Sequence, residues 1–255
     1  SNQSGSTLVL AAVLFTFQIY GDFSGYSDIA IGTAKLFGIK LMRNFNVPYF
    51  SRDIAEFWRR WHISLTTWFR DYVYIPLGGS RPVVPNRLKA KGERREARYT
   101  KWIAVRNTFV IFLLSGFWHG ANWTFVLWGA YHALLFVPLL LLGKNRRYRD
   151  DDQTWRDVPK MLGTFLLVVV GWILFRSPDI VCFIDYLSGI CDRSVLSMPL
   201  VENAFHLSAT GIAIVLMLTM EWRKQLPNRW WIYFALTLAI WWFAGQDVDF
   251  IYFQF

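Results

Sequence analysis

Apolar residues in this chain gather into blocks, and most charged residues lie in the gaps between the blocks. About 20 apolar residues are enough for a helix to cross the hydrocarbon core of a membrane. The pattern therefore predicts an all-α, polytopic helical membrane protein with about five to six spanning or re-entrant helices. Several blocks are shorter than a straight span, so we expect flanking amphipathic residues or broken helices buried in protein. The blocks are 8–20, 102–117, 123–142, 161–175, 207–220 and 230–244.

A different pattern follows Pro48, where apolar and aromatic side chains recur every three or four residues between charged ones. This spacing predicts an amphipathic helix, too polar to span, that lies in the membrane interface or across the bundle. Ser51 is the expected N-cap, and the turn 76–79 ends the segment. The aromatic stripe consists of Ile54, Phe57, Trp58, Trp61, Leu65, Trp68, Phe69 and Tyr72.

The net charge of +9 is concentrated in the loops beside the apolar blocks. Residues 81–101 hold eight Lys or Arg against two Glu, and residues 144–160 hold six against four Asp. Residues 176–206, in contrast, hold two basic and four acidic residues. Basic loops remain in the cytoplasm, so this alternation predicts a multi-pass protein whose 118–121 turn faces the outer side or the membrane middle. A nucleic-acid partner is not expected, because such proteins gather their charge on a soluble face.

His119 stands between two apolar blocks, 102–117 and 123–142. A polar side chain at membrane depth is costly, and its usual explanation is a functional site. Imidazole also suits acid–base chemistry near neutral pH, so His119 is the leading candidate for a general base. The alternative is a helix-end histidine that bonds a backbone carbonyl.

The other candidate groups carry weaker signals. His62 lies on the amphipathic segment, and His132 and His206 are expected to be structural. The cluster with Asp22, Ser24 and Asp28 either caps a helix start or lines a cavity, and both interpretations stay open. No metal site is expected, because no two histidines lie within twelve residues of each other. Cys182 and Cys191 are expected to be small buried residues.

Several stretches together carry a resemblance to a known family. They are QIYGDFSGYSD at 18–28, NFNVPY at 44–49, EFWRRWHIS at 56–64, RDYVYIPLGG at 70–79, SGFWHGA at 115–121 and FIYFQF at 250–255. In this order they closely resemble the membrane-bound O-acyltransferase (MBOAT) family, in the branch that O-acetylates alginate and related exopolysaccharides. The teichoic-acid D-alanylation protein is a more distant relative.

The resemblance implies a single integral-membrane acyltransferase domain over 1–255, similar to the C-terminal portion of longer members whose N-terminal helices are absent here. The catalytic histidine of the family maps onto His119, and its second histidine maps onto His62. The implied localisation is the bacterial inner membrane. No bound cofactor is expected. The acyl donor would be a cytoplasmic thioester, acetyl-CoA or an acyl carrier protein, and the acceptor an extracytoplasmic polysaccharide such as alginate.

Three further residues receive roles as substrate-binding candidates. Asn122, together with His62, is expected to orient the acyl group or donate to the developing oxyanion. Arg94 and Arg95 are candidates for docking the phosphates of coenzyme A or an acidic carrier protein, against the alternative of an ordinary basic loop.

Two other functions compete with direct transfer. The protein could relay the acyl group across the membrane to a separate periplasmic transferase. A non-catalytic membrane scaffold for polymer export is the alternative from another class, and it predicts that His119 tolerates substitution.

Overall fold

The computed structural model describes residues 3–79, 84–90, 92–148, 153–223 and the pairs 231–232, 234–235 and 237–238. Within these residues the regular structure is entirely helical, which confirms the all-α prediction. The chain forms two compact units, Ser1–Met198 and Pro199–Phe255, and each is described by itself. The prediction of a single domain over 1–255 stays a prediction. The expected span 230–244 and the motif 250–255 lie largely or wholly outside the described residues.

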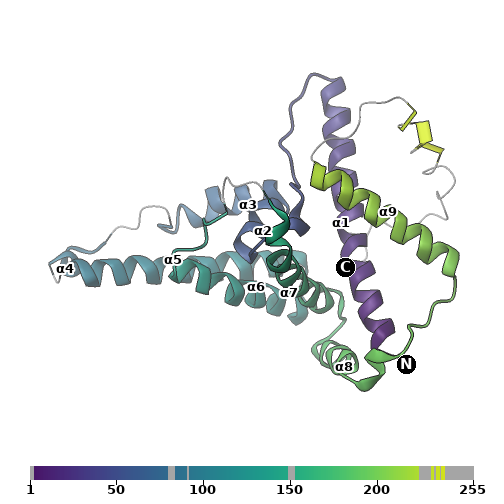
Figure 1. Cartoon of the computed structure of the whole chain (residues 1–255). Helices are drawn as coiled ribbons and strands as arrows, with labels where there is room; N and C mark the ends of the chain where they lie inside the picture. The colour runs from purple at the N-terminus through teal and green to yellow at the C-terminus, as the bar shows by residue number, and fades with distance from the viewer. Residues whose placement is uncertain are drawn as a thin grey trace. The chain divides into compact units, whose positions relative to one another are not determined.

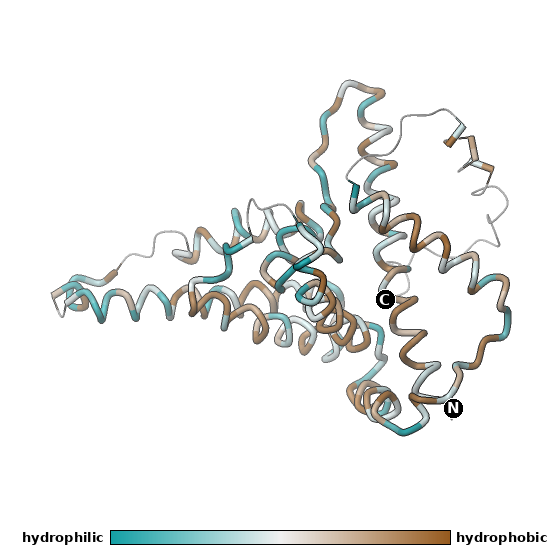
Figure 2. Tube along the Cα trace, viewed as in Figure 1, coloured by the Kyte–Doolittle hydropathy of each residue, from teal (hydrophilic) through white to brown (hydrophobic). Residues whose placement is uncertain are grey.

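Four helices in the described part of the chain are long and apolar enough to cross a membrane. They are α1 (Gly5–Leu36), α6 (Trp123–Leu141), α7 (Val158–Arg176) with the short 3₁₀ turn Trp155–Asp157 before it, and α9 (Ala204–Arg223) of the second unit. Figure 2 shows the apolar character of α6, α7 and the first half of α1. The chain is therefore a multi-pass membrane protein, as the apolar blocks predicted.

Helix α1 is longer than the expected block 8–20. It begins after Ser4, whose hydroxyl accepts a hydrogen bond from the backbone N–H of Thr7, and it continues to Leu36. Gly38, with φ of 74°, follows its end. The polar stretch 21–28 thus lies inside the helix. The expectation that this stretch caps a helix start is wrong, because no proline or competing turn interrupts the chain there.

Helices α5 (Glu93–His119) and α6 form the most extensive helix pair of the first unit (Figure 1). Two glycines allow their backbones to approach closely. A Cβ atom on Gly116 would collide with the carbonyl oxygen of Phe125, and one on Gly129 would collide with that of Phe112. The apolar block 102–117 is therefore the second half of a longer helix. Its first half was expected to be loop, and the short helix α4 (Asn86–Lys89) precedes it.

The amphipathic segment is not one helix but two, α2 (Ile54–Arg60) and α3 (Ile63–Phe69), followed by a π-helical turn over Arg70–Tyr74. The N-cap of α2 is Asp53, which accepts from the backbone N–H of Glu56, so the expected cap at Ser51 is wrong. Ser51 instead donates to the carbonyl of Pro48 and ends the 3₁₀ turn Pro48–Phe50. No proline or glycine in the sequence marks the break between α2 and α3.

Packing of aromatic rings fixes α2 against α1 and α7. Trp61 contacts Tyr20 of α1, Phe45 of the connecting loop and Trp172 of α7, with ring centroids 5.0–5.9 Å apart. Edge-on and tilted ring pairs of this kind add to the burial of apolar surface. The site described below rests on this aromatic core.

Helix α8 (Ile180–Ile190) and the 3₁₀ turn Arg193–Leu196 complete the first unit. Cys182 lies in α8 and Cys191 directly follows it, and both are free and exposed. The expectation that they are small buried residues is therefore wrong.

Candidate functional site

His119 is the last residue of α5, and the short turn after it leads into α6. Gly120, with φ of 153°, ends the helix in a conformation that other residues adopt rarely. Rings from three helices surround the imidazole: Trp118 of α5, Trp128 of α6 and Phe175 of α7, at centroid distances of 4.9, 5.4 and 5.0 Å. The side chain is half-buried. His119 is thus held by three helices at once.

His62 occupies the break between α2 and α3, where its backbone adopts a left-handed conformation with φ of 45°. Its Nδ1 atom lies 3.1 Å from Oδ1 of Asn44, and its ring packs edge-on against Phe23 of α1 at 4.7 Å. The ring of Trp118 contacts both imidazoles, at 6.5 Å from His62 and 4.9 Å from His119. The fold therefore brings together two histidines that are far apart in the sequence.

Both imidazoles lie outside the four candidate spans, and both are neutral near pH 7. Burial lowers the pKa of His62 to about 4. Burial, and then electrostatic repulsion from His62, lowers the pKa of His119 to about 3. A neutral imidazole carries one N–H donor and one nitrogen that accepts a proton or hydrogen bond. The pair can therefore receive a proton from a bound hydroxyl without first losing one.

The three α1 candidates, Asp22, Ser24 and Asp28, lie along the second half of that helix. Asp22 and Ser24 are half-buried, and Asp28 is exposed. The residues of α1 that reach the histidine region are instead Phe23 and Ser27, which accepts a hydrogen bond from Asn44. With a capping role ruled out, the cavity-lining role of the three candidates stays a prediction.

Asn122 has a structural role. It is the N-cap of α6, where its side-chain oxygen accepts from the backbone N–H of Thr124 at 3.1 Å. Its side-chain nitrogen donates to the carbonyl of Pro178 at 2.7 Å and so ties the turn to the end of α7. These bonds engage both polar atoms of the amide, and the expected role of Asn122 at the oxyanion stays a prediction.

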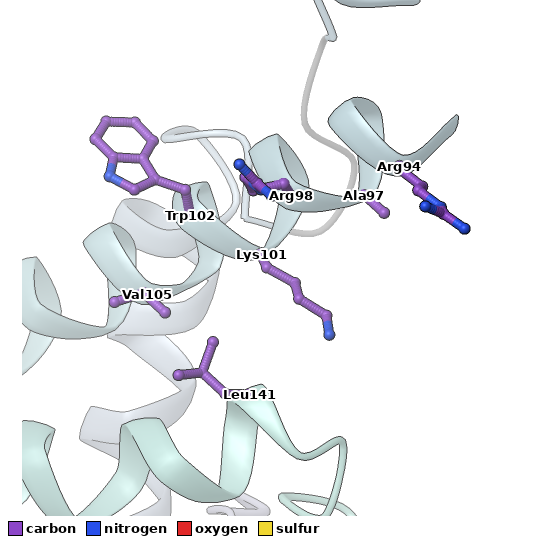
Figure 3. Close-up of a pocket in the computed structure, with 7 residues that line it drawn as sticks. All are labelled: Arg94, Ala97, Arg98, Lys101, Trp102, Val105 and Leu141. Atoms are coloured by element: carbon purple, nitrogen blue, oxygen red, sulfur yellow. The ribbon is translucent and has the colours of Figure 1, made fainter. Parts of the chain in front are cut away.

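Arg94 and Arg95 lie in the first turn of α5, at the opposite end of that helix from His119. Arg94 lines an open pocket of about 530 Å³ together with Ala97, Arg98, Lys101, Trp102, Val105 and Leu141, and Arg95 does not. Arg94 and Lys101 extend to the same side of α5 (Figure 3). The basic side chains that line the pocket are Arg94, Arg98 and Lys101. Among the described residues, no carboxylate lies within ion-pair distance of any of them. The pocket thus combines basic side chains with an apolar lining.

The remaining histidines are separate from this pair. His132 is fully buried, packed against Trp58 and Trp128, and its Nδ1 atom has no hydrogen-bond partner in the described structure. His206 is exposed on α9.

Sequence reasoning missed Asn44, Phe23 and Trp118 as parts of the site. Asn44 begins the stretch 44–49, which had already carried the family resemblance, so a signal was present. No local pattern shows which side chain an extended loop presents to a histidine eighteen residues later.

Comparison with known proteins gives a consistent set of matches. A profile of the membrane-bound O-acyltransferase family matches residues 2–92, which include His62 but not His119. A probable alginate O-acetylase (AlgI) of Pseudomonas aeruginosa is 44% identical over 171 residues, which are 67% of this chain and 29% of that protein. A peptidoglycan O-acetyltransferase of Helicobacter pylori is 37% identical over 193 residues, 74% of this chain and 32% of the relative.

A teichoic acid D-alanyltransferase of Bacillus subtilis is 34% identical over 169 residues, 63% of this chain and 39% of the relative. The matched region thus spans between 29% and 39% of the length of these three relatives. The family profile and the identities to these relatives agree: the chain belongs to the membrane-bound O-acyltransferase family.

Proposed function

We propose that this protein is a membrane O-acyltransferase of the bacterial inner membrane. It moves an acyl group, which we take to be acetyl, from a cytoplasmic thioester donor to a hydroxyl of an extracytoplasmic polysaccharide such as alginate. The observation that carries the proposal is the position of the His119 imidazole, which three helices hold beside His62. The names of two relatives, an alginate O-acetylase and a peptidoglycan O-acetyltransferase, support acetyl as the group and a glycan as the acceptor.

In the proposed reaction His119 is the general base. The acceptor hydroxyl oxygen attacks the thioester carbonyl while His119 takes the hydroxyl proton. The tetrahedral intermediate then collapses, the carbon–sulfur bond breaks, and His119 returns the proton to the sulfur, which leaves as a thiol. The products are an ester on the glycan and a free thiol, so no further reactant is needed.

The length of α5 supports transfer between compartments. Lys101 and His119 are 18 residues apart on this helix, or about 27 Å at 1.5 Å per residue. Helix α5 is not one of the four candidate spans, but this distance is close to the roughly 30 Å thickness of the hydrocarbon core. The basic pocket at the start of α5 would then lie near the cytoplasmic face, where basic residues concentrate, and His119 would lie toward the other side.

The distance between the pocket and His119 limits the role that the pocket can have in binding the acyl donor. A phosphate held by Arg94, Arg98 or Lys101 lies a helix length away from His119. We therefore assign the pocket to capture of the anionic donor, coenzyme A or a carrier protein, rather than to holding it during transfer. Arg95, which does not line the pocket, has no part in this proposal.

Substitution of His119 by Gln tests the proposal. Loss of a general base typically costs about 10² to 10⁴ in rate, so transfer of labelled acetyl to the glycan should nearly disappear. His206→Gln is the matched control, because His206 is exposed on α9 and should tolerate the change. Membrane expression of both variants is measured in parallel.

Normal acetylation by His119→Gln would overturn the assignment and favour the export scaffold. Transfer to a second protein before the glycan, seen as a labelled acyl-protein intermediate, would favour the relay.

A further inference from the structure

Asn44 is bonded to three neighbours through its side-chain amide. Its Oδ1 atom lies 3.2 Å from the backbone nitrogen of Ser64, 2.9 Å from the hydroxyl of Ser64 and 3.1 Å from Nδ1 of His62. Its Nδ2 atom donates to the hydroxyl of Ser27 on α1 at 3.1 Å. The backbone carbonyl of Asn44 also accepts from the N–H of Ile63 at 2.8 Å. One residue therefore connects α1, His62 and the start of α3.

This arrangement fixes which way the amide points. A backbone N–H can only donate, so the Asn44 atom facing the Ser64 nitrogen must be the oxygen. An amide oxygen in turn can only accept, so the ring nitrogen that faces it, Nδ1 of His62, carries the hydrogen. The hydroxyl of Ser64 also lies 3.3 Å from this nitrogen, but its shorter bond, at 2.9 Å, goes to Oδ1 of Asn44. In a neutral imidazole the other nitrogen, Nε2, is then without a proton. Protonation of both nitrogens is disfavoured by the burial of the ring.

We propose that Asn44 is a positioning residue that holds His62 in the Nδ1–H tautomer, so that Nε2 of His62 acts as a hydrogen-bond acceptor in the site. The inference rests on the proposed function, and it changes one role expected from the sequence. An unprotonated Nε2 repels a carbonyl oxygen or an oxyanion and attracts an O–H group. His62 therefore binds a hydroxyl of the acceptor glycan, not the oxyanion of the acyl group.

The backbone gives a reason for the arrangement. His62 adopts a left-handed conformation that costs energy for a side chain other than glycine, asparagine or aspartate. The bonds from Asn44 to Ile63, Ser64 and the ring compensate for this cost. The strained conformation at the break between α2 and α3 thus leaves Nε2 of His62 as the nitrogen that accepts a hydrogen bond in the proposed site.

The tautomer can be measured directly in the complete protein. With ¹⁵N-labelled histidine, the ring signals of His62 are identified by their loss in His62→Gln. We expect a protonated Nδ1 and an unprotonated Nε2. A wild-type signal with the hydrogen on Nε2 would overturn the proposal.

Substitutions of Asn44 then separate positioning from folding. Asn44→Ala removes the acceptor oxygen and should populate the Nε2–H tautomer, with acetyl transfer lowered by about 10- to 100-fold, the range found for partners that orient metal-bound histidines. Asn44→Asp keeps an acceptor oxygen and should retain the Nδ1–H form. Ser64→Ala separates the two partners of Nδ1, because it removes the hydroxyl 3.3 Å from that nitrogen and leaves the bond between Asn44 and His62 in place. An Nδ1–H form that persists in Ser64→Ala assigns the tautomer to Asn44.

If Asn44→Ala does not fold, Asn44→Asp still decides the matter. A carboxylate 3.1 Å from Nδ1 must raise the pKa of His62, and an unchanged His62 titration in this variant would overturn the contact. An Asn44→Ala variant with the wild-type tautomer would overturn the positioning role. The tautomer readout needs no turnover, so a wild-type protein that transfers no acetyl would contradict the proposed function while leaving the Asn44 result intact.

Discussion

At the scale of single residues, the candidate site is a pair of histidines with different surroundings. His119 is enclosed by aromatic rings, whereas His62 has a fixed polar partner in Asn44. The two rings interact electrostatically, and both charged forms are disfavoured. The chemistry of the site therefore depends on neutral imidazoles, one that takes a proton and one that accepts a hydrogen bond.

This neutrality predicts an unusual pH dependence. A base works in its unprotonated form, which is present above its pKa, and the pKa values are about 3 for His119 and about 4 for His62. The transfer rate should therefore stay level from about pH 8 to about pH 5 and fall only as the pH approaches these values. The measurement is kcat/KM of acetyl transfer in proteoliposomes against pH. A break near 6.5, the ordinary value for histidine, would contradict the burial of the pair.

At the scale of helices, the sequence anticipated some elements better than others. Helices α6, α7 and α9 match the apolar blocks 123–142, 161–175 and 207–220 to within a few residues. The patterns failed for α1 and α5, whose helices extend through polar residues, and for the break at His62. Hydrophobic periodicity predicts where a face is buried, but helix ends depend on caps and tertiary bonds.

The α5–α6 pair supplies a prediction at this scale. Gly129→Ala adds a Cβ atom that collides with the backbone carbonyl of Phe112, and backbone atoms can move only by separating the two helices. Overpacking of this kind costs about 1–3 kcal/mol, so the melting temperature of the purified protein should fall. Gly163→Ala on α7 is the control, because no atom lies within 4 Å of its added Cβ. Equal melting temperatures for the two variants would exclude this packing.

At the scale of the whole molecule, the distribution of charge along α5 supports the proposed transfer across a membrane. The cationic pocket lies at one end and His119 at the other (Figure 1, Figure 3). Figure 2 shows that the chain becomes hydrophilic toward the start of α5. One helix thus joins a basic surface suited to an anionic donor with a half-buried site suited to proton transfer.

Charge reversal in the pocket tests the capture role. In an Arg94→Glu, Arg98→Glu double variant, kcat/KM for acetyl-CoA should fall about tenfold, and high salt should shrink the difference. The maximal rate at saturating donor should change little, because the pocket lies a helix length from His119. Arg95→Glu is the control, because Arg95 is exposed in the same turn of α5 and does not line the pocket. A KM that rises equally in both variants would mean that general surface charge, not this pocket, attracts the donor.

The amino-acid sequence was sufficient to predict the properties that depend on neighbours along the chain. These are the apolar blocks and the basic segments between them, since hydrophobicity and charge act locally on insertion into a membrane. Tertiary structure alone decided that His62 sits in a strained break, that Asn44 orients it, and that Trp118 contacts both imidazoles. These contacts join residues from separate segments, and only the packing of the folded helices brings such residues within hydrogen-bond or ring-contact distance.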